Sequence, residues 1–151
     1  MRHLIPNLIF TFFYGSAVYA GVCDSGRDTQ KILCNGTNQI RAENGVRELH
    51  EDSHLDRMAD DYAYRLWQYN GGGQGMALTH EIPGHEFALR MRDEGVAMPC
   101  AENIAVGQHT MHQVLDSWHG SPGHFANMIN GQYQRIGNGY YKGFWVQIFS
   151  R

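Results

Sequence analysis

The chain has 151 residues, of which 42% are hydrophobic and 18% charged, and its formal net charge is −3. This length and composition predict one globular domain and exclude a disordered or fibrous protein. The small negative charge and the lack of any run of five Lys or Arg residues exclude a nucleic-acid-binding protein.

The N-terminal segment is typical of a secretory signal peptide. Arg2 and His3 precede an apolar run at residues 4–13, and small residues up to Ala20 offer a cleavage site. The apolar run is too short to span a bilayer. We therefore expect residues 1–20 to be removed and the mature protein to be secreted to the extracellular space, without an integral membrane segment.

Secretion also decides how the three cysteines, Cys23, Cys34 and Cys100, are interpreted. In an oxidising compartment an exposed pair tends to close, and an odd number leaves one thiol free or paired with another chain. A covalent dimer has no other support in the sequence, so we expect a monomer. The segment Asn35-Gly36-Thr37 is an N-x-[ST] sequon, which predicts a glycan on Asn35 in a eukaryotic host.

The first half of the mature chain is expected to be mainly helical. Residues 21–33 are small and polar and predict a flexible N-terminal arm, and a first helix is expected over about 37–45. The strongest helical pattern covers 53–69, with its initial serine as the expected N-cap and Asp56 in the place of a capping-box acid. The apolar face of this helix comprises Leu55, Met58, Ala59, Tyr62, Ala63, Leu66 and Tyr69. A glycine-rich run at 70–75 then ends it.

The second half consists of shorter elements that end in a hairpin. They are a loop over 76–84, a helix over 86–94, a helix capped by Thr110, a helix with Ser121 as cap and Pro122 at its first position, and strands over 133–141 and 144–149. Helices first and a β-hairpin last predict an α+β fold.

The nine histidines invite a metal or catalytic interpretation. The segment from His80 to His85 is similar to the HExxH motif of zinc proteases, but its second histidine comes one residue too late to share a helical face with the first. Pro83-Gly84 would also break that helix. No nucleophile elbow or phosphate-binding loop is present, so no catalytic residue is assigned.

A dispersed set of polar residues remains, namely His80, Glu102 and His124. Two imidazoles and a carboxylate can form a divalent-metal site or a hydrogen-bonded cluster without metal. Spacing in the sequence does not show whether these three side chains meet.

Five segments in order resemble the CAP superfamily, which comprises cysteine-rich secretory, antigen 5 and pathogenesis-related class 1 proteins. They are Asn38-Gln39-Ile40-Arg41 with the helix that follows, Thr79-His80 with Arg90 and Gly95, Ala101-Glu102-Asn103-Ile104-Ala105, the run from Ser117 to His124 with Asn127, and the closing segments 135–137 and 144–147. Together they cover about residues 34–149 and are most similar to the bacterial and fungal branch.

This resemblance implies a three-layer α-β-α sandwich with a small antiparallel sheet over residues 34–151. It also implies a central cleft that carries His80, Glu102 and His124. Animal and plant members usually have a glutamate near the position at which this chain has Ser121. The implied metal site for zinc or another divalent cation is therefore reduced, with His80 and His124 as ligands and water completing the shell.

The resemblance also implies a disulfide. Fungal members often carry one cysteine before the first helix and another just before the glutamate signature. Cys34 and Cys100 occupy those positions, so the resemblance pairs them and leaves Cys23 free.

Three functions stay open at this point. The favoured one is a secreted, non-enzymatic binding module for a sterol or fatty acid, or for a host or microbial surface. The second is a metal-assisted hydrolase or protease that uses the same cleft. The third is a purely structural cluster of His80, Glu102 and His124, with the interaction function elsewhere.

Overall fold

The computed structural model describes Cys23 and residues 26–151, so the predicted signal peptide lies outside the described residues. The elements are α1 (Asp28–Glu43), β1 (His50–Glu51), α2 (Ser53–Tyr69), β2 (Glu81–Ile82), β3 (His85–Glu86), α3 (Phe87–Asp93), β4 (Cys100–Val106), α4 (Met111–His119), α5 (Pro122–Met128), β5 (Arg135–Tyr141) and β6 (Phe144–Ser150). Among the described residues, no helix combines the length and the apolar character needed to cross a membrane.

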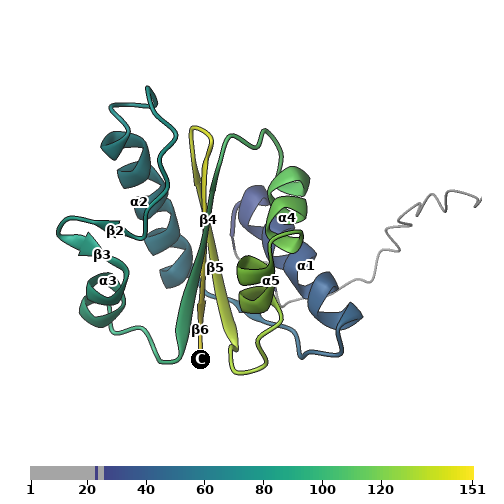
Figure 1. Cartoon of the computed structure of the whole chain (residues 1–151). Coiled ribbons are helices and arrows are strands. Elements are labelled where there is room, and N and C mark those ends of the chain that lie inside the picture. Colours follow the sequence, from purple (N-terminus) through teal and green to yellow (C-terminus); the bar gives the residue numbers. More distant parts are fainter. Residues whose placement is uncertain (1–22, 24–25) are drawn as a thin grey trace, which may run out of the picture.

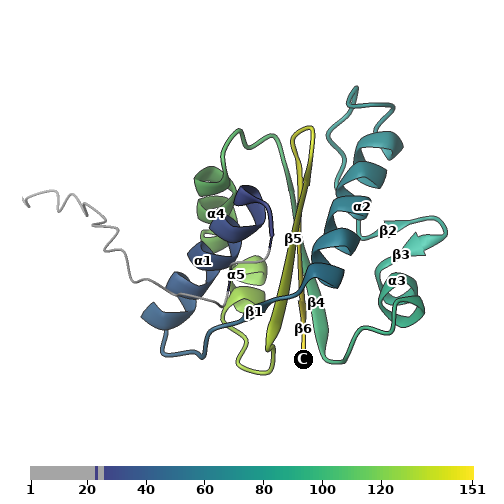
Figure 2. The same cartoon turned by 180° about the vertical axis from the view of Figure 1, so that it is seen from behind.

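The elements form three layers around a four-stranded sheet with the order β1-β5-β6-β4 (Figures 1 and 2). Helices α1, α4 and α5 cover one face, and α2 and α3 with the β2–β3 hairpin cover the other. The strands β5, β6 and β4 are antiparallel, as expected, while β1 adds a short parallel pair to β5. The predicted α+β sandwich is therefore confirmed.

The sheet separates two apolar cores because successive strand side chains point to opposite faces. Along β6, Trp145 and Phe149 belong to the core beneath α1, α4 and α5, whereas Val146 and Ile148 belong to the core beneath α2 and α3. Every residue of β6 is buried, which fits a central strand.

The first helix begins at Asp28, nine residues before the predicted start, so the expected arm over 21–33 is wrong for its helical part. Gly36 lies inside this helix, although a glycine in a helix interior usually weakens it. Here α4 lies so close that a Cβ on Gly36 would be 2.4 Å from a methyl group of Leu115. The glycan on Asn35 stays a prediction; its side chain is exposed on α1.

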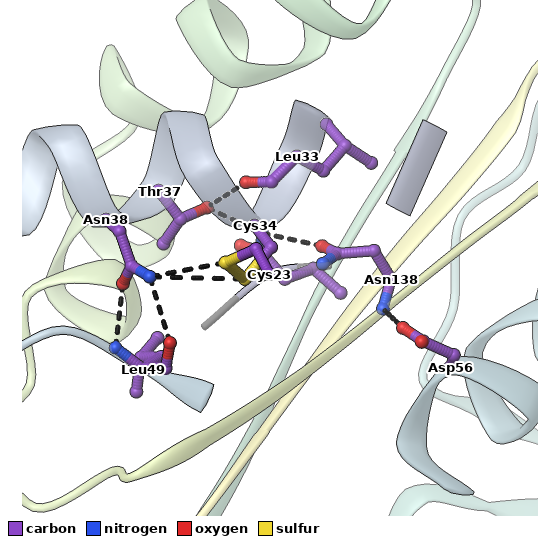
Figure 3. Close-up of a disulfide and its surroundings, with 9 residues drawn as sticks. Cys23, Leu33, Cys34, Thr37, Asn38, Leu49, Asp56 and Asn138 are labelled. Atoms are coloured by element: carbon purple, nitrogen blue, oxygen red, sulfur yellow. Dashed lines mark hydrogen bonds between the residues drawn. A yellow bond between two sulfur atoms is a disulfide. The ribbon is translucent and has the colours of Figure 1, made fainter. Parts of the chain in front are cut away.

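The predicted disulfide between Cys34 and Cys100 is wrong, because Cys23 pairs with Cys34 (Figure 3). Cys34 lies in the core beneath α1, whereas Cys100 packs against the core on the opposite face of the sheet. The sheet therefore stands between the two thiols. Cys100 is the free cysteine among the described residues, and burial raises the pKa of its thiol.

Helix α2 lies directly against strand β5. A Cβ on Gly137 or Gly139 would be 2.2 Å from the α2 backbone, so only glycine allows this approach. The N-cap of α2 is Asp52 rather than the predicted Ser53, and its carboxylate accepts hydrogen bonds from the backbone of the first turn. Asp56 does not act as a capping-box acid, because it accepts a 2.8 Å hydrogen bond from the backbone N–H of Asn138.

Asp56 should make the stability of the fold depend on pH. Burial raises its pKa to about 7 from the ordinary 3.8, against the opposing hydrogen bond from Asn138. The folded state therefore keeps a proton that the unfolded chain releases, so the free energy of unfolding should fall as pH rises from 3.8 to about 7. Asp56→Asn stays neutral and can still accept from the Asn138 N–H, so this variant should lose that part of the decline.

Urea denaturation at several pH values tests this expectation. The exposed Asp116, changed to Asn, supplies the control, which should follow the parent. Identical pH profiles for the parent and the Asp56→Asn variant would show that Asp56 is ordinary in the folded state.

Candidate functional site

Two side chains from separate parts of the chain meet at Glu102 on strand β4. The Arg90 guanidinium on α3 donates to both carboxylate oxygens at 2.9 Å, and His80 Nδ1 lies 2.8 Å from Oε1. The Glu102 side chain is only 1% exposed and that of Arg90 9%, while that of His80 is 42% exposed. A buried carboxylate is thus neutralised by a bidentate arginine and carries an imidazole at the surface.

Arg90 is itself fixed in place. Its guanidinium carbon lies 3.5 Å from the centre of the Tyr62 ring on α2, and its Nε donates to the His85 carbonyl at 2.9 Å. Tyr62 in turn donates its hydroxyl to the Thr79 carbonyl, next to His80. Stacking and hydrogen bonding together hold the planar guanidinium in one orientation. In the sequence Arg90 stands out only as part of a resembling segment, and its role as the partner of Glu102 was not predicted.

The contact with Glu102 decides which nitrogen of His80 carries the proton. A carboxylate only accepts hydrogen bonds, so Nδ1 is the donor. In the neutral ring Nε2 is then the acceptor, and it belongs to the exposed part of the side chain. His80 therefore presents one hydrogen-bonding atom to a ligand in an orientation set by Glu102 and Arg90.

His124, on α5, lies within electrostatic reach of His80. Burial, followed by the neighbouring His80, lowers the pKa of His124. Its Nδ1 is buried and makes no hydrogen bond among the described residues, which is a rare and costly condition for a native polar atom. The carbonyl of His124 accepts from Asn103 on β4, so α5 is bonded to the sheet at this point.

A buried amide network supports that bond. Asn127 of α5 donates to Asn103 at 2.9 Å, Asn103 reaches Gln147 on β6, and Gln147 donates to Thr37 and Asn138. The network runs over the face of the sheet that α1 and α5 cover, across β4, β6 and β5, and it fixes the position of α5. In the sequence Asn127 and Asn103 stand out only as parts of resembling segments, and this network was not predicted.

Ser121 precedes α5, and its side chain makes no capping hydrogen bond, contrary to the prediction. Pro122 stands at the expected first helical position. Among the described residues, no hydrogen bond joins Ser121 to His80, Glu102 or His124 through its side chain. Ser121 is thus half-buried just before α5, and its hydroxyl makes no hydrogen bond with these residues or with the first turn of the helix.

The donor set does not suit a three-ligand metal site. Within Cys23 and residues 26–151, no group of three or more His, Cys, Asp or Glu side chains is arranged to hold a metal ion. Both oxygens of Glu102 are engaged by Arg90 and His80. Structural and catalytic zinc sites use three or four protein ligands, and only the rings of His80 and His124 remain here.

A hollow of about 450 Å³ lies on the other side of Arg90, between α2 and the segment from β3 to α3. Its lining is mostly polar and charged: His54, Arg57, Met58, Asp61, Arg65, Gly84, His85, Leu89, Arg90, Asp93 and Glu94. Inside it, Arg65 contacts both Asp61 at 2.6 Å and His85 Nε2 at 2.8 Å.

Comparison with known proteins gives consistent matches. The model of the cysteine-rich secretory protein family, CAP, matches residues 34–149. The YkwD protein of Bacillus subtilis is 31% identical over 125 residues, which cover 80% of this chain and 46% of that protein. The chain thus spans less than half the length of this relative.

Solved structures show the same fold. An extracellular protein from Bacillus anthracis that contains an SCP domain has a TM-score of 0.73 and 25% identity, covering 82% of this chain and 40% of that one. An outer surface protein from Borrelia burgdorferi has a TM-score of 0.69 and 23% identity, covering 80% of this chain and 90% of that one.

Proposed function

Since the chain belongs to the cysteine-rich secretory protein (CAP) family, we propose that it is an extracellular binding module whose cleft holds a partner without transforming it. The cleft, as the term is used below, is the site of His80, Glu102, Ser121 and His124. Two of the solved structures that the chain resembles are an extracellular protein and an outer surface protein, which is consistent with this placement.

The bidentate pairing of Arg90 with Glu102 carries the proposal. A carboxylate that serves as a metal ligand or a general base needs a free lone pair directed at the metal or the substrate. Glu102 is buried and both of its oxygens are bound, so it supports neither role. What the cluster offers is a rigid surface on which the exposed edge of His80 is oriented for recognition.

The nature of the surroundings favours a polar partner at a cell surface over a sterol or fatty acid. Most of the residues that line the hollow beside Arg90 are of charged or polar type, and only Met58 and Leu89 contribute large apolar side chains to it. Among the exposed large apolar side chains, Met76 and Leu78 lie on the loop before His80, and Met98 lies just before β4. A lipid site needs an enclosed apolar lining, which these residues do not provide.

A fragment screen by NMR tests the proposal on the isotope-labelled chain. Small polar organic fragments should shift the amide signals of His80, Glu102, Ser121 and His124. The same protein should leave fluorescein-labelled casein uncut, with or without added zinc. Fragment shifts that are absent or confined to other surfaces, or zinc-dependent cleavage of casein, would contradict the binding function.

Zinc titration separates the metal hypothesis from this proposal. Because Glu102 is engaged, we expect calorimetry to show no tight one-site binding of zinc to the parent chain. The matched comparison is the His80→Ala/His124→Ala double variant, whose heats should be the same as the parent's. Tight, saturable binding that disappears in the double variant would place a zinc ion on His80 and His124, and it would return the hydrolase to consideration.

A further inference from the structure

The rest of the described chain supplies hydrogen-bonding partners to one edge of the sheet and not to the other. At the β5 edge, beyond the short pairing with β1, helix α2 supplies carboxylates to the strand's outward backbone. Asp56 accepts from the N–H of Asn138 at 2.8 Å, and Asp60 accepts from the N–H of Tyr140 at 3.1 Å. Covering an edge in this way prevents another strand from pairing there.

The β4 edge lacks such a cover. Two backbone hydrogen bonds flank the pairing of β4 with β6. The Arg151 N–H donates to the Pro99 carbonyl, and the Gly107 N–H donates to the Gly143 carbonyl. Pro99 and Gly107, the residues on the β4 side of these bonds, both have odd numbers. In an antiparallel pair hydrogen-bonded positions alternate, so Ala101, Asn103 and Ala105 bond to β6. The N–H and C=O groups of Glu102 and Ile104 therefore point away from the sheet. Among the described residues, none supplies a hydrogen-bonding partner to them.

This open edge carries Glu102, one of the four residues that define the cleft. Glu102 as a whole residue is 6% exposed although its side chain is 1% exposed, so the accessible part is main chain. His80 contacts Glu102 from one side, and the bond from Asn103 to the His124 carbonyl ties α5 on the other. Figure 1 shows β4 facing the viewer between the α2–α3 layer and the α5 layer.

The recessed position restricts what can pair with β4. Glu102, Asn103, Ile104 and Ala105 are each no more than 6% exposed, so the neighbouring layers leave little room beside the β4 backbone. The sheet edge of a second copy of this chain would bring its own helices against these layers. A single extended peptide has the alternating donors and acceptors of a strand without that bulk.

Deepening the proposed function, we propose that the partner docks as an extended polypeptide segment that adds a strand to β4, pairing with the N–H and C=O groups of Glu102 and Ile104. Main-chain hydrogen bonds then supply affinity that is largely independent of sequence. Selectivity comes from the neighbouring layers, where Nε2 of His80 and the hydroxyl of Ser121 meet side chains of the added strand.

Selection of displayed random peptides of about nine residues, long enough to span β4, supplies the probe. The strongest binder is synthesised with an N-methyl group placed at each residue in turn. Because only every second N–H of an added strand faces β4, affinity should fall by about tenfold or more at alternate positions and little between them. Amide hydrogen exchange at Glu102 and Ile104 should slow when the peptide binds, while exchange at Asn103, already bonded to β6, should not change.

Val106→Pro adds an independent check, since the N–H of Val106 is another outward group at an even position of β4. This variant should bind the peptide more weakly than Val106→Ala, which keeps the N–H. Failure to enrich any peptide, N-methyl effects without alternation, or unchanged exchange at Glu102 and Ile104 would each overturn strand addition. Slower amide exchange at Glu102 and Ile104 without peptide, caused by self-association of the chain at high concentration, would also overturn strand addition by a peptide. If no peptide binds but polar fragments still shift the amide signals of the cleft, only strand addition fails and the binding function stands. If neither peptides nor fragments bind at the cleft, both proposals fail.

Discussion

Replacing Glu102 by alanine is expected to lower the free energy of unfolding by about 3 to 5 kcal/mol, because it leaves the largely buried Arg90 guanidinium without its counter-charge. Urea denaturation of the parent and the variant gives this value directly. Glu94→Ala is the matched control, since Glu94 pairs with His54 at 3.4 Å with both side chains well exposed. Surface pairs contribute less than about 1 kcal/mol.

Equal losses for Glu102→Ala and Glu94→Ala would mean that the pair with Arg90 does not hold α3 and the His80 loop to β4. Arg90→Met with Glu102→Leu should recover part of the loss, because no buried charge is then left unpaired. Recovery by the double change would assign the cost of Glu102→Ala to the orphaned guanidinium rather than to lost packing.

Gly139→Ala is expected to cost about 3 kcal/mol or more, at the upper end of overpacking effects. The added Cβ would lie 2.2 Å from backbone atoms of Ala59 and Asp60, so α2 would have to move away from β5. That movement would also stretch the bond from the Tyr140 N–H to Asp60. The loss is measurable as a lower denaturation midpoint.

Gly131→Ala is the control for this change, because a Cβ there meets nothing within 4 Å and Gly131 has no positive φ. It should leave the stability nearly unchanged or raise it slightly. If Gly139→Ala behaves like Gly131→Ala, the close approach of α2 to β5 does not exist in solution.

Local patterns predicted most of the elements, and the elements they missed depend on tertiary contacts. The apolar periodicity of α2, the threonine cap of α4 and the alternating hairpin of β5 and β6 are confirmed. The start of α1 was predicted too late because residues 21–33 are small and polar, which is typical of a flexible arm, whereas α1 begins at Asp28. Gly137 and Gly139, two glycines within a strand pattern, are a sequence signal for close backbone approach, but no helix contact was predicted from them.

The site was only partly visible for the same reason. The resemblance supplied His80, Glu102 and His124, and the structure brings His80 onto Glu102 and His124 near His80. The sequence could not show that Arg90 takes both oxygens of Glu102, since this depends on where α3 docks. The wrong pairing of Cys34 with Cys100 has a related cause, because sequence position does not reveal which face of the sheet a cysteine occupies.

The most direct test of the binding function compares His80→Ala with the parent in two measurements on the same samples, urea denaturation and fragment titration by NMR. His80 is 42% exposed at its side chain, so its loss should change the free energy of unfolding by no more than about 1 kcal/mol. Fragment affinity at the cleft should nevertheless fall by about tenfold. Unchanged affinity in this stable variant would contradict the account and leave the cluster of His80, Glu102 and Arg90 as a structural element alone.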